Sequence, residues 1–150
     1  MQYAGWALQI PECRLRRMDF VFYHFPVRHV PVPIAVAGDS MVSMEIDVLS
    51  VKKMRDAGEK FVLLDVREPG EVATAKIDGS RHMPMREIPA RLAELSPHKA
   101  ERIVVHCHHG GRSQRVTHYL RQQGFSQVQN MSGGIDDWSL KVDSTVPRYE

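Results

Sequence analysis

Seven consecutive residues combine a nucleophile, positive charge and a flexible backbone: Cys107, His108, His109, Gly110, Gly111, Arg112 and Ser113. A cysteine beside cations or at a helix N-terminus ionises with a pKa of roughly 3.5–7.5, and the thiolate is the reactive form. The glycines allow a tight turn whose N–H groups point inward and form an anion nest. Arg112 adds a cation with a planar fork, and His108 and His109 add partial positive charge near neutral pH. The segment therefore predicts a thiolate that takes up and holds an anionic group.

The elements on either side of this loop predict where the thiol lies. Residues 102–106 form a short apolar run that is typical of a buried strand, and residues 113–123 show helical spacing that ends before Gly124. Cys107 would then lie at the carboxyl end of a strand, where ligands bind in open α/β sheets. The positive end of the following helix would add to the field at the sulfur.

Strand and helix signals alternate from residue 45 onward. A proline-rich stretch, residues 1–43, precedes them, and we expect it to be an irregular arm. Alternation favours a three-layer α/β/α fold in which helices cover both faces of a mostly parallel sheet, over residues 44–150. The further strands are predicted at 61–66 and 128–131, and the further helices at 51–57, 68–71, 88–95 and 135–140.

Composition excludes several classes of protein. The chain has 150 residues, of which 43% are hydrophobic and 25% charged, and this is ordinary for one globular domain. A net charge of +2 gives no broad field for nucleic acid or for a membrane surface. No run of about 18 apolar residues is present, so we expect no membrane span, a cytoplasmic protein and, by default, a monomer.

The two cysteines, Cys13 and Cys107, cannot form a disulfide framework. Cys13 is more simply interpreted as a small buried hydrophobic residue, because the sequence around it shows no pattern of catalytic residues. The histidines beside Cys107 also suggest a metal site, but no second group of ligands stands at metal-binding spacing. We therefore expect no metal and no cofactor, and Cys107 is the candidate nucleophile.

Three segments, in this order, resemble the rhodanese (sulfurtransferase) family of the single-domain kind. They are Leu63-Leu-Asp-Val-Arg-Glu-Pro-Gly-Glu71, Cys107-His-His-Gly-Gly-Arg-Ser113 and Gly133-Gly-Ile-Asp-Asp-Trp138. The resemblance covers about residues 45–148 and implies a rhodanese-like fold. One stretch departs from the family pattern, because Lys76 and Asp78 stand where many relatives have histidine and proline.

The resemblance implies that Cys107 moves sulfane sulfur from thiosulfate, or from a persulfide donor, to cyanide or a thiol through a persulfide intermediate. Its partners would be a small anionic donor and a thiol or cyanide acceptor, which could be a protein thiol. Arg112 and His108 would steer the donor, and the backbone of residues 108–113 would stabilise the persulfide. Asp65 and Arg67 end a predicted strand and are more simply interpreted as anchors of neighbouring loops through hydrogen bonds, and Arg67 is a further candidate for contact with the donor.

Other functions remain open at this point. Cysteine phosphatases have five residues between cysteine and arginine, whereas four separate Cys107 from Arg112, and this favours sulfur transfer. A non-catalytic rhodanese-like module that only binds a partner is a second alternative, although the complete loop argues against it. A protein-to-protein sulfur relay, in which turnover of thiosulfate is incidental, is a third.

Overall fold

The structure is a computed structural model that describes residues 42–150. The predicted arm, except for its last two residues, and Cys13 lie outside this range. Within it, no helix is long and apolar enough to cross a membrane.

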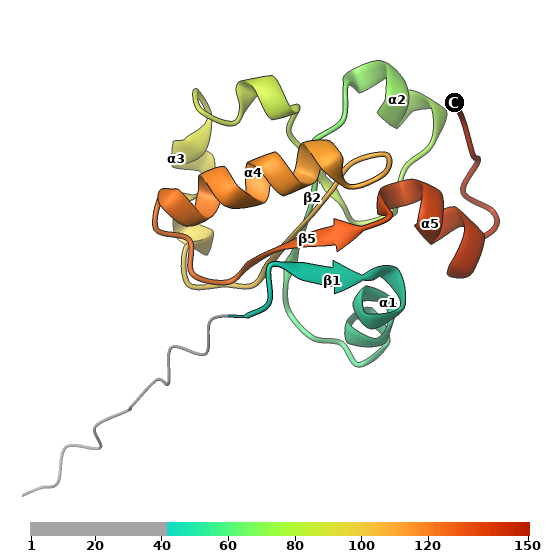
Figure 1. Cartoon of the computed structure of the whole chain (residues 1–150), viewed down its shortest axis with the longest axis horizontal. Helices are drawn as coiled ribbons and strands as arrows, with labels where there is room; N and C mark the ends of the chain where they lie inside the picture. Colours follow the sequence, from blue (N-terminus) through green and yellow to red (C-terminus); the bar gives the residue numbers. More distant parts are fainter. Residues whose placement is uncertain (1–41) are drawn as a thin grey trace, which may run out of the picture. The chain divides into compact units, whose positions relative to one another are not determined.

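A parallel sheet of five strands forms the middle layer (Figure 1). The strands are β1 (Glu45–Asp47), β2 (Val62–Asp65), β3 (Arg81–His82), β4 (Ile103–His106) and β5 (Val128–Ser132). Their order across the sheet is β1-β5-β4-β2-β3, and every neighbouring pair is parallel. The predicted three-layer α/β fold is confirmed. The β4 strand lies in the centre, so the residue that follows it emerges from the middle of the sheet edge.

Helices cover both faces of this sheet (Figure 1). They are α1 (Val48–Asp56), α2 (Pro69–Thr74), α3 (Leu92–Leu95), α4 (Gly111–Gln122) and α5 (Gly134–Lys141), with 3₁₀ turns at Met85–Glu87 and Ser96–His98. One apolar cluster joins α3 and α4 to one face, and a second joins α1 and α5 to the other. Successive residues of β4 alternate between the clusters, since Val104 packs in one and Val105 in the other.

Several predicted boundaries were wrong for local reasons. The first helix begins at Val48 rather than residue 51, because the Asp47 carboxylate accepts hydrogen bonds from the N–H groups of Leu49 and Ser50. The predicted helix 88–95 is helical only over Leu92–Leu95, and the turn before it contains Pro89. The two shortest strands, β1 and β3, were not predicted.

Candidate active site

Cys107 directly follows β4 and lies at the carboxyl edge of the sheet. Its side chain is buried. The chain then turns sharply through Gly110, whose φ of 108° lies in the left-handed region that favours glycine. This turn starts α4 at Gly111, two residues earlier than predicted, and directs the helix N-terminus toward the sulfur.

The sulfur of Cys107 lies in a small ring of hydrogen-bond donors. The Gly110 N–H donates to Sγ at 3.1 Å, and the Ser113 hydroxyl lies 3.3 Å from it. Burial raises the pKa of the Cys107 thiol, but hydrogen bonds from the Ser113 hydroxyl and from the N–H groups of Ser113, Gly110 and Arg112 together hold the pKa below its usual value. Cys107 therefore has the environment of a nucleophilic thiolate.

The N-terminus of α5 binds the outer side of the same loop. The Ile135 N–H donates to the carbonyl oxygen of Cys107 at 2.9 Å, and the Asp136 N–H donates to that of His108 at 3.2 Å. A side chain at Gly134 would stand only 2.2 Å from the His108 carbonyl oxygen, so glycine is required there. By holding these two carbonyls outward, α5 leaves the loop's N–H groups free to face the sulfur. The sequence indicated only a turn at this position.

The two histidines of the loop stack on each other, with ring centroids 3.9 Å apart. The other face of the His108 ring stacks on Tyr149 at 4.2 Å. Burial and the neighbouring His109 lower the pKa of His108, so this ring carries less positive charge near neutral pH than an isolated histidine does. The His109 side chain is exposed, and its Nδ1 lies 3.9 Å from the Asp136 carboxylate.

The guanidinium of Arg112 is already paired. Its Nη1 and Nη2 donate to the two carboxylate oxygens of Glu71 at 2.6 Å each, in a fork-to-fork geometry. The same pair lowers the pKa of Glu71 to about 2. Glu71 lies in α2, within the first of the three segments singled out in the sequence. The three segments therefore converge at Cys107: α2 reaches it through Arg112, and α5 through the loop carbonyls.

Comparison with known proteins agrees with this arrangement. The family model for the rhodanese-like domain matches residues 47–141. The chain belongs to the rhodanese family. A sulfurtransferase of Allochromatium vinosum is 37% identical over 63% of this chain and 87% of its own length. Thiosulfate sulfurtransferase GlpE of Stutzerimonas stutzeri is 36% identical over 65% of this chain and 85% of its own length.

Longer relatives and solved structures share the rhodanese fold. A rhodanese-like/PpiC domain-containing chloroplast protein of Arabidopsis thaliana is 41% identical over 58% of this chain, which spans only 30% of that protein. The crystal structure of a rhodanese-like domain protein from Staphylococcus aureus superposes with a TM-score of 0.62 at 26% identity, covering 72% of this chain and all of the other. The sheet and its covering helices are thus those of the family.

Arg67 lies behind the rhodanese loop as a fully buried side chain. Its guanidinium donates to the Asp65 carboxylate, to the Tyr149 hydroxyl and to the carbonyl oxygens of Glu71 and Ala75. Burial alone would raise the pKa of Asp65, but the hydrogen bonds from Arg67 help to hold it below its usual value. Every N–H direction of Arg67 is used within the protein, so we propose that it positions neighbouring segments instead of contacting the donor.

His106 is a buried histidine one residue before the nucleophile. Neither ring nitrogen has a hydrogen-bond partner within residues 42–150, and the Asp65 carboxylate lies 3.8 Å from Nε2. Burial lowers the pKa of His106 to about 4, against the smaller opposing effect of Asp65. The ring is therefore neutral. Elsewhere in the described residues, no three His, Cys, Asp or Glu side chains gather closely enough to hold a metal ion.

Proposed function

We propose that residues 44–150 form a sulfurtransferase domain that moves sulfane sulfur from thiosulfate or a persulfide donor to cyanide or a thiol. The observation that carries this proposal is the Cys107 sulfur, which accepts a hydrogen bond from the Gly110 N–H and lies beside the Ser113 hydroxyl. The names of two relatives that match nearly their whole length support it. A free Cys107 thiol fits a protein working in the cytoplasm, where cysteines stay reduced.

The reaction has two displacements at Cys107. In the first, the thiolate attacks the outer sulfur of thiosulfate, the bond between the two donor sulfurs breaks, and its electron pair leaves on sulfite. In the second, the acceptor attacks the outer sulfur of the Cys107 persulfide, and the thiolate is restored. The donors that stabilise the thiolate also stabilise the persulfide anion, because the loop's N–H groups face the place where that charge lies.

The acceptor can be a protein thiol, as in a sulfur relay between proteins. A largely apolar cavity of about 180 Å³ is lined by Met85, Ile88, Pro89, Arg115, Val116 and Tyr119. Two of these residues, Ile88 and Val116, pack in the same core cluster as Cys107. This apolar cavity favours a macromolecule as a second candidate acceptor, in addition to cyanide and small thiols.

Mass spectrometry after treatment with thiosulfate tests the sulfurtransferase proposal. We expect the reduced protein to gain one sulfur atom, to lose it on addition of cyanide, and to show no gain in the variant Cys107→Ser. The matched control is Cys13→Ser, which keeps the nucleophile and should gain sulfur as the original protein does.

A different result would overturn the proposal. If an alkylating agent labels Cys107 while neither thiosulfate nor an organic persulfide adds sulfur to it, the domain is a binding module. Hydrolysis of an aryl phosphate that is lost in Cys107→Ser would instead identify a phosphatase.

A further inference from the structure

The cation nearest the nucleophile is neutralised in this structure. Both Nη atoms of Arg112 are held at 2.6 Å by the carboxylate oxygens of Glu71. Positive charge on the neighbouring His108 ring is disfavoured as well, because burial and His109 lower its pKa. A donor that approaches Cys107 therefore meets an arginine together with its counter-ion, and no unpaired guanidinium.

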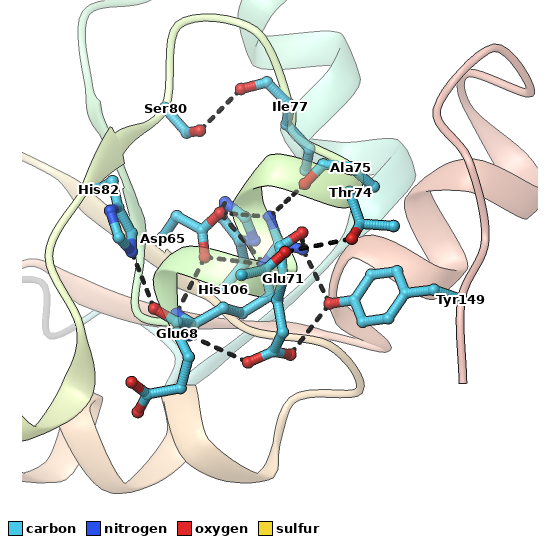
Figure 2. A network of polar contacts seen from close by, with 12 residues as sticks. Asp65, Glu68, Glu71, Thr74, Ala75, Ile77, Ser80, His82, His106 and Tyr149 are labelled. Atoms are coloured by element: carbon cyan, nitrogen blue, oxygen red, sulfur yellow. Dashed lines mark hydrogen bonds and ion pairs between the residues drawn. The ribbon is translucent and has the colours of Figure 1, made fainter.

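Tyr149 holds this carboxylate in place from the segment that follows α5 (Figure 2). Its hydroxyl donates to Glu71 Oε1 at 3.1 Å and accepts from Arg67 Nη1 at 2.8 Å. Its ring stacks nearly parallel to the His108 ring, with 9° between the planes. Since Asp65 fixes Arg67 in the core, Tyr149 connects a buried ion pair to the Glu71 carboxylate.

The Glu71 carboxylate therefore accepts hydrogen bonds from several neighbouring groups. Besides Arg112 and Tyr149, the Glu68 N–H donates to its Oε2 at 3.0 Å. A dianion such as thiosulfate must either displace this well-held carboxylate or bind beside it, and both cost free energy because like charges repel at close range. A donor with one negative charge or none meets a smaller opposing field. The arrangement therefore discriminates between sulfur donors by their charge.

We propose that Tyr149 is a specificity-determining residue that holds Glu71 on Arg112, so that Cys107 favours sulfane donors with at most one negative charge, such as organic persulfides, over thiosulfate. This inference rests on the proposed sulfurtransferase function. With a persulfide R–S–SH, the Cys107 thiolate attacks the outer sulfur and the bond between the two donor sulfurs breaks. The electron pair leaves on R–S⁻, and the proton stays on the new Cys107–S–SH group. No oxidant or reductant is needed.

The test compares two donors that share a sulfonyl-type shape and differ by one charge, thiosulfate and the methanethiosulfonate anion. The measured quantity is the ratio of kcat/KM for thiosulfate to kcat/KM for methanethiosulfonate, so intrinsic differences in donor reactivity cancel between variants. We expect this ratio to rise about threefold in Tyr149→Phe, which keeps the stacked ring and loses the hydroxyl. It should rise roughly tenfold in Glu71→Gln, which keeps an amide oxygen for Arg112 and loses the charge. The change should appear in KM for thiosulfate and hardly in kcat.

Thr117→Val is the matched control, because Thr117 is buried and its hydroxyl has no hydrogen-bond partner within residues 42–150. Its donor ratio should equal that of the original protein. An unchanged ratio in Tyr149→Phe, with normal thermal melting, would overturn the inference, whatever the ratio in Glu71→Gln. So would a fall of the ratio in Glu71→Gln, which would show that Glu71 presents Arg112 to the dianion. Failure of the sulfurtransferase function is distinguishable, because neither donor would then add sulfur to Cys107 in the unaltered protein.

Discussion

Ser113 offers the sulfur of Cys107 its side-chain hydroxyl, at 3.3 Å. The same oxygen lies 3.0 Å from the Gly110 carbonyl, and its single proton can serve only one acceptor at a time. Ionisation of Cys107 should turn this proton toward the sulfur, because a charged acceptor forms the stronger hydrogen bond. Ser113 thus stabilises the thiolate more than the thiol, and this difference lowers the pKa of Cys107.

Replacing Ser113 by alanine should make the thiol less acidic. We expect the pKa of Cys107 in Ser113→Ala to rise, because a donor to the charged form is lost. At a pH below the midpoint, the alkylation rate should fall up to roughly tenfold, as for one hydrogen bond to a charged group. The pH dependence of reaction with iodoacetamide measures this.

Ser139→Ala is the control for this variant, since Ser139 is also buried but its hydroxyl has no partner within the described residues. Its alkylation profile should match that of the original protein. An unshifted profile in Ser113→Ala would mean that the backbone N–H groups alone determine the acidity of Cys107.

The sequence predicted those site residues that adjoin the nucleophile along the chain. Cys107, Gly110 and Ser113 were found because one short loop carries all of them. Glu71 and Tyr149 could not be assigned this way, because Arg112 lies 41 positions after Glu71 and Tyr149 lies 78 positions after it. Nothing in the local sequence pattern states that such distant side chains meet.

At the scale of elements, α5 acts on the site through its backbone. Its first N–H groups bind the carbonyl oxygens of Cys107 and His108, and Gly134 makes this approach possible. Main-chain hydrogen bonds do not depend on the type of side chain, so the sequence indicated only a turn before a helix. The short strands β1 and β3, of three and two residues, escaped prediction because pairing within the sheet, not residue pattern, defines them.

Gly134→Ala should disrupt the active-site loop. The new Cβ would stand 2.2 Å from the His108 carbonyl oxygen and 2.5 Å from that of Cys107, at a φ of 60° that alanine rarely adopts. We expect a loss of about 2–4 kcal/mol in the free energy of unfolding, and at least a tenfold slower gain of sulfur by the fraction that stays folded. Urea denaturation and single-turnover mass spectrometry measure the two effects.

The matched substitution is Gly70→Ala in α2, where no atom lies within 4 Å of the added Cβ. It should leave the free energy of unfolding unchanged or raise it by up to about 1 kcal/mol, and leave sulfur uptake unchanged. If Gly134→Ala behaves like Gly70→Ala, the contact between α5 and the loop has no role in reactivity.

At the scale of the whole molecule, the buried His106 makes stability depend on pH. Its pKa in the folded protein is about 4, below the ordinary value of 6.5 that applies to the unfolded chain. Between these values the unfolded chain binds a proton that the folded protein excludes, so folding loses stability as pH falls from 6.5 toward 4. Between pH 6.5 and pH 4 the free energy of unfolding falls by a total on the order of 3 kcal/mol. Above pH 6.5 this loss is absent.

Replacing His106 by leucine, which is similar in volume and apolar, should remove most of this dependence. Denaturant unfolding at pH 7 and at pH 4.5 measures it, and the drop in unfolding free energy between the two should shrink by roughly 2 kcal/mol in His106→Leu. His118→Gln, at an exposed position on α4, should keep the original drop. A drop that is as large in His106→Leu as in the original protein would show that carboxylates account for the acid sensitivity.

The contact between α5 and the Cys107 loop also has a consequence for how the protein is made. The ribosome delivers Cys107 first, and residues 135 and 136, which hold the loop carbonyls, follow almost thirty positions later. Until these residues have emerged and α5 has docked, the nascent chain carries a cysteine of ordinary acidity. We therefore expect Cys107 to become an acidic, nucleophilic thiol only once the domain is complete. We expect oxidants and electrophiles met during synthesis to encounter a less acidic thiol than the finished protein presents.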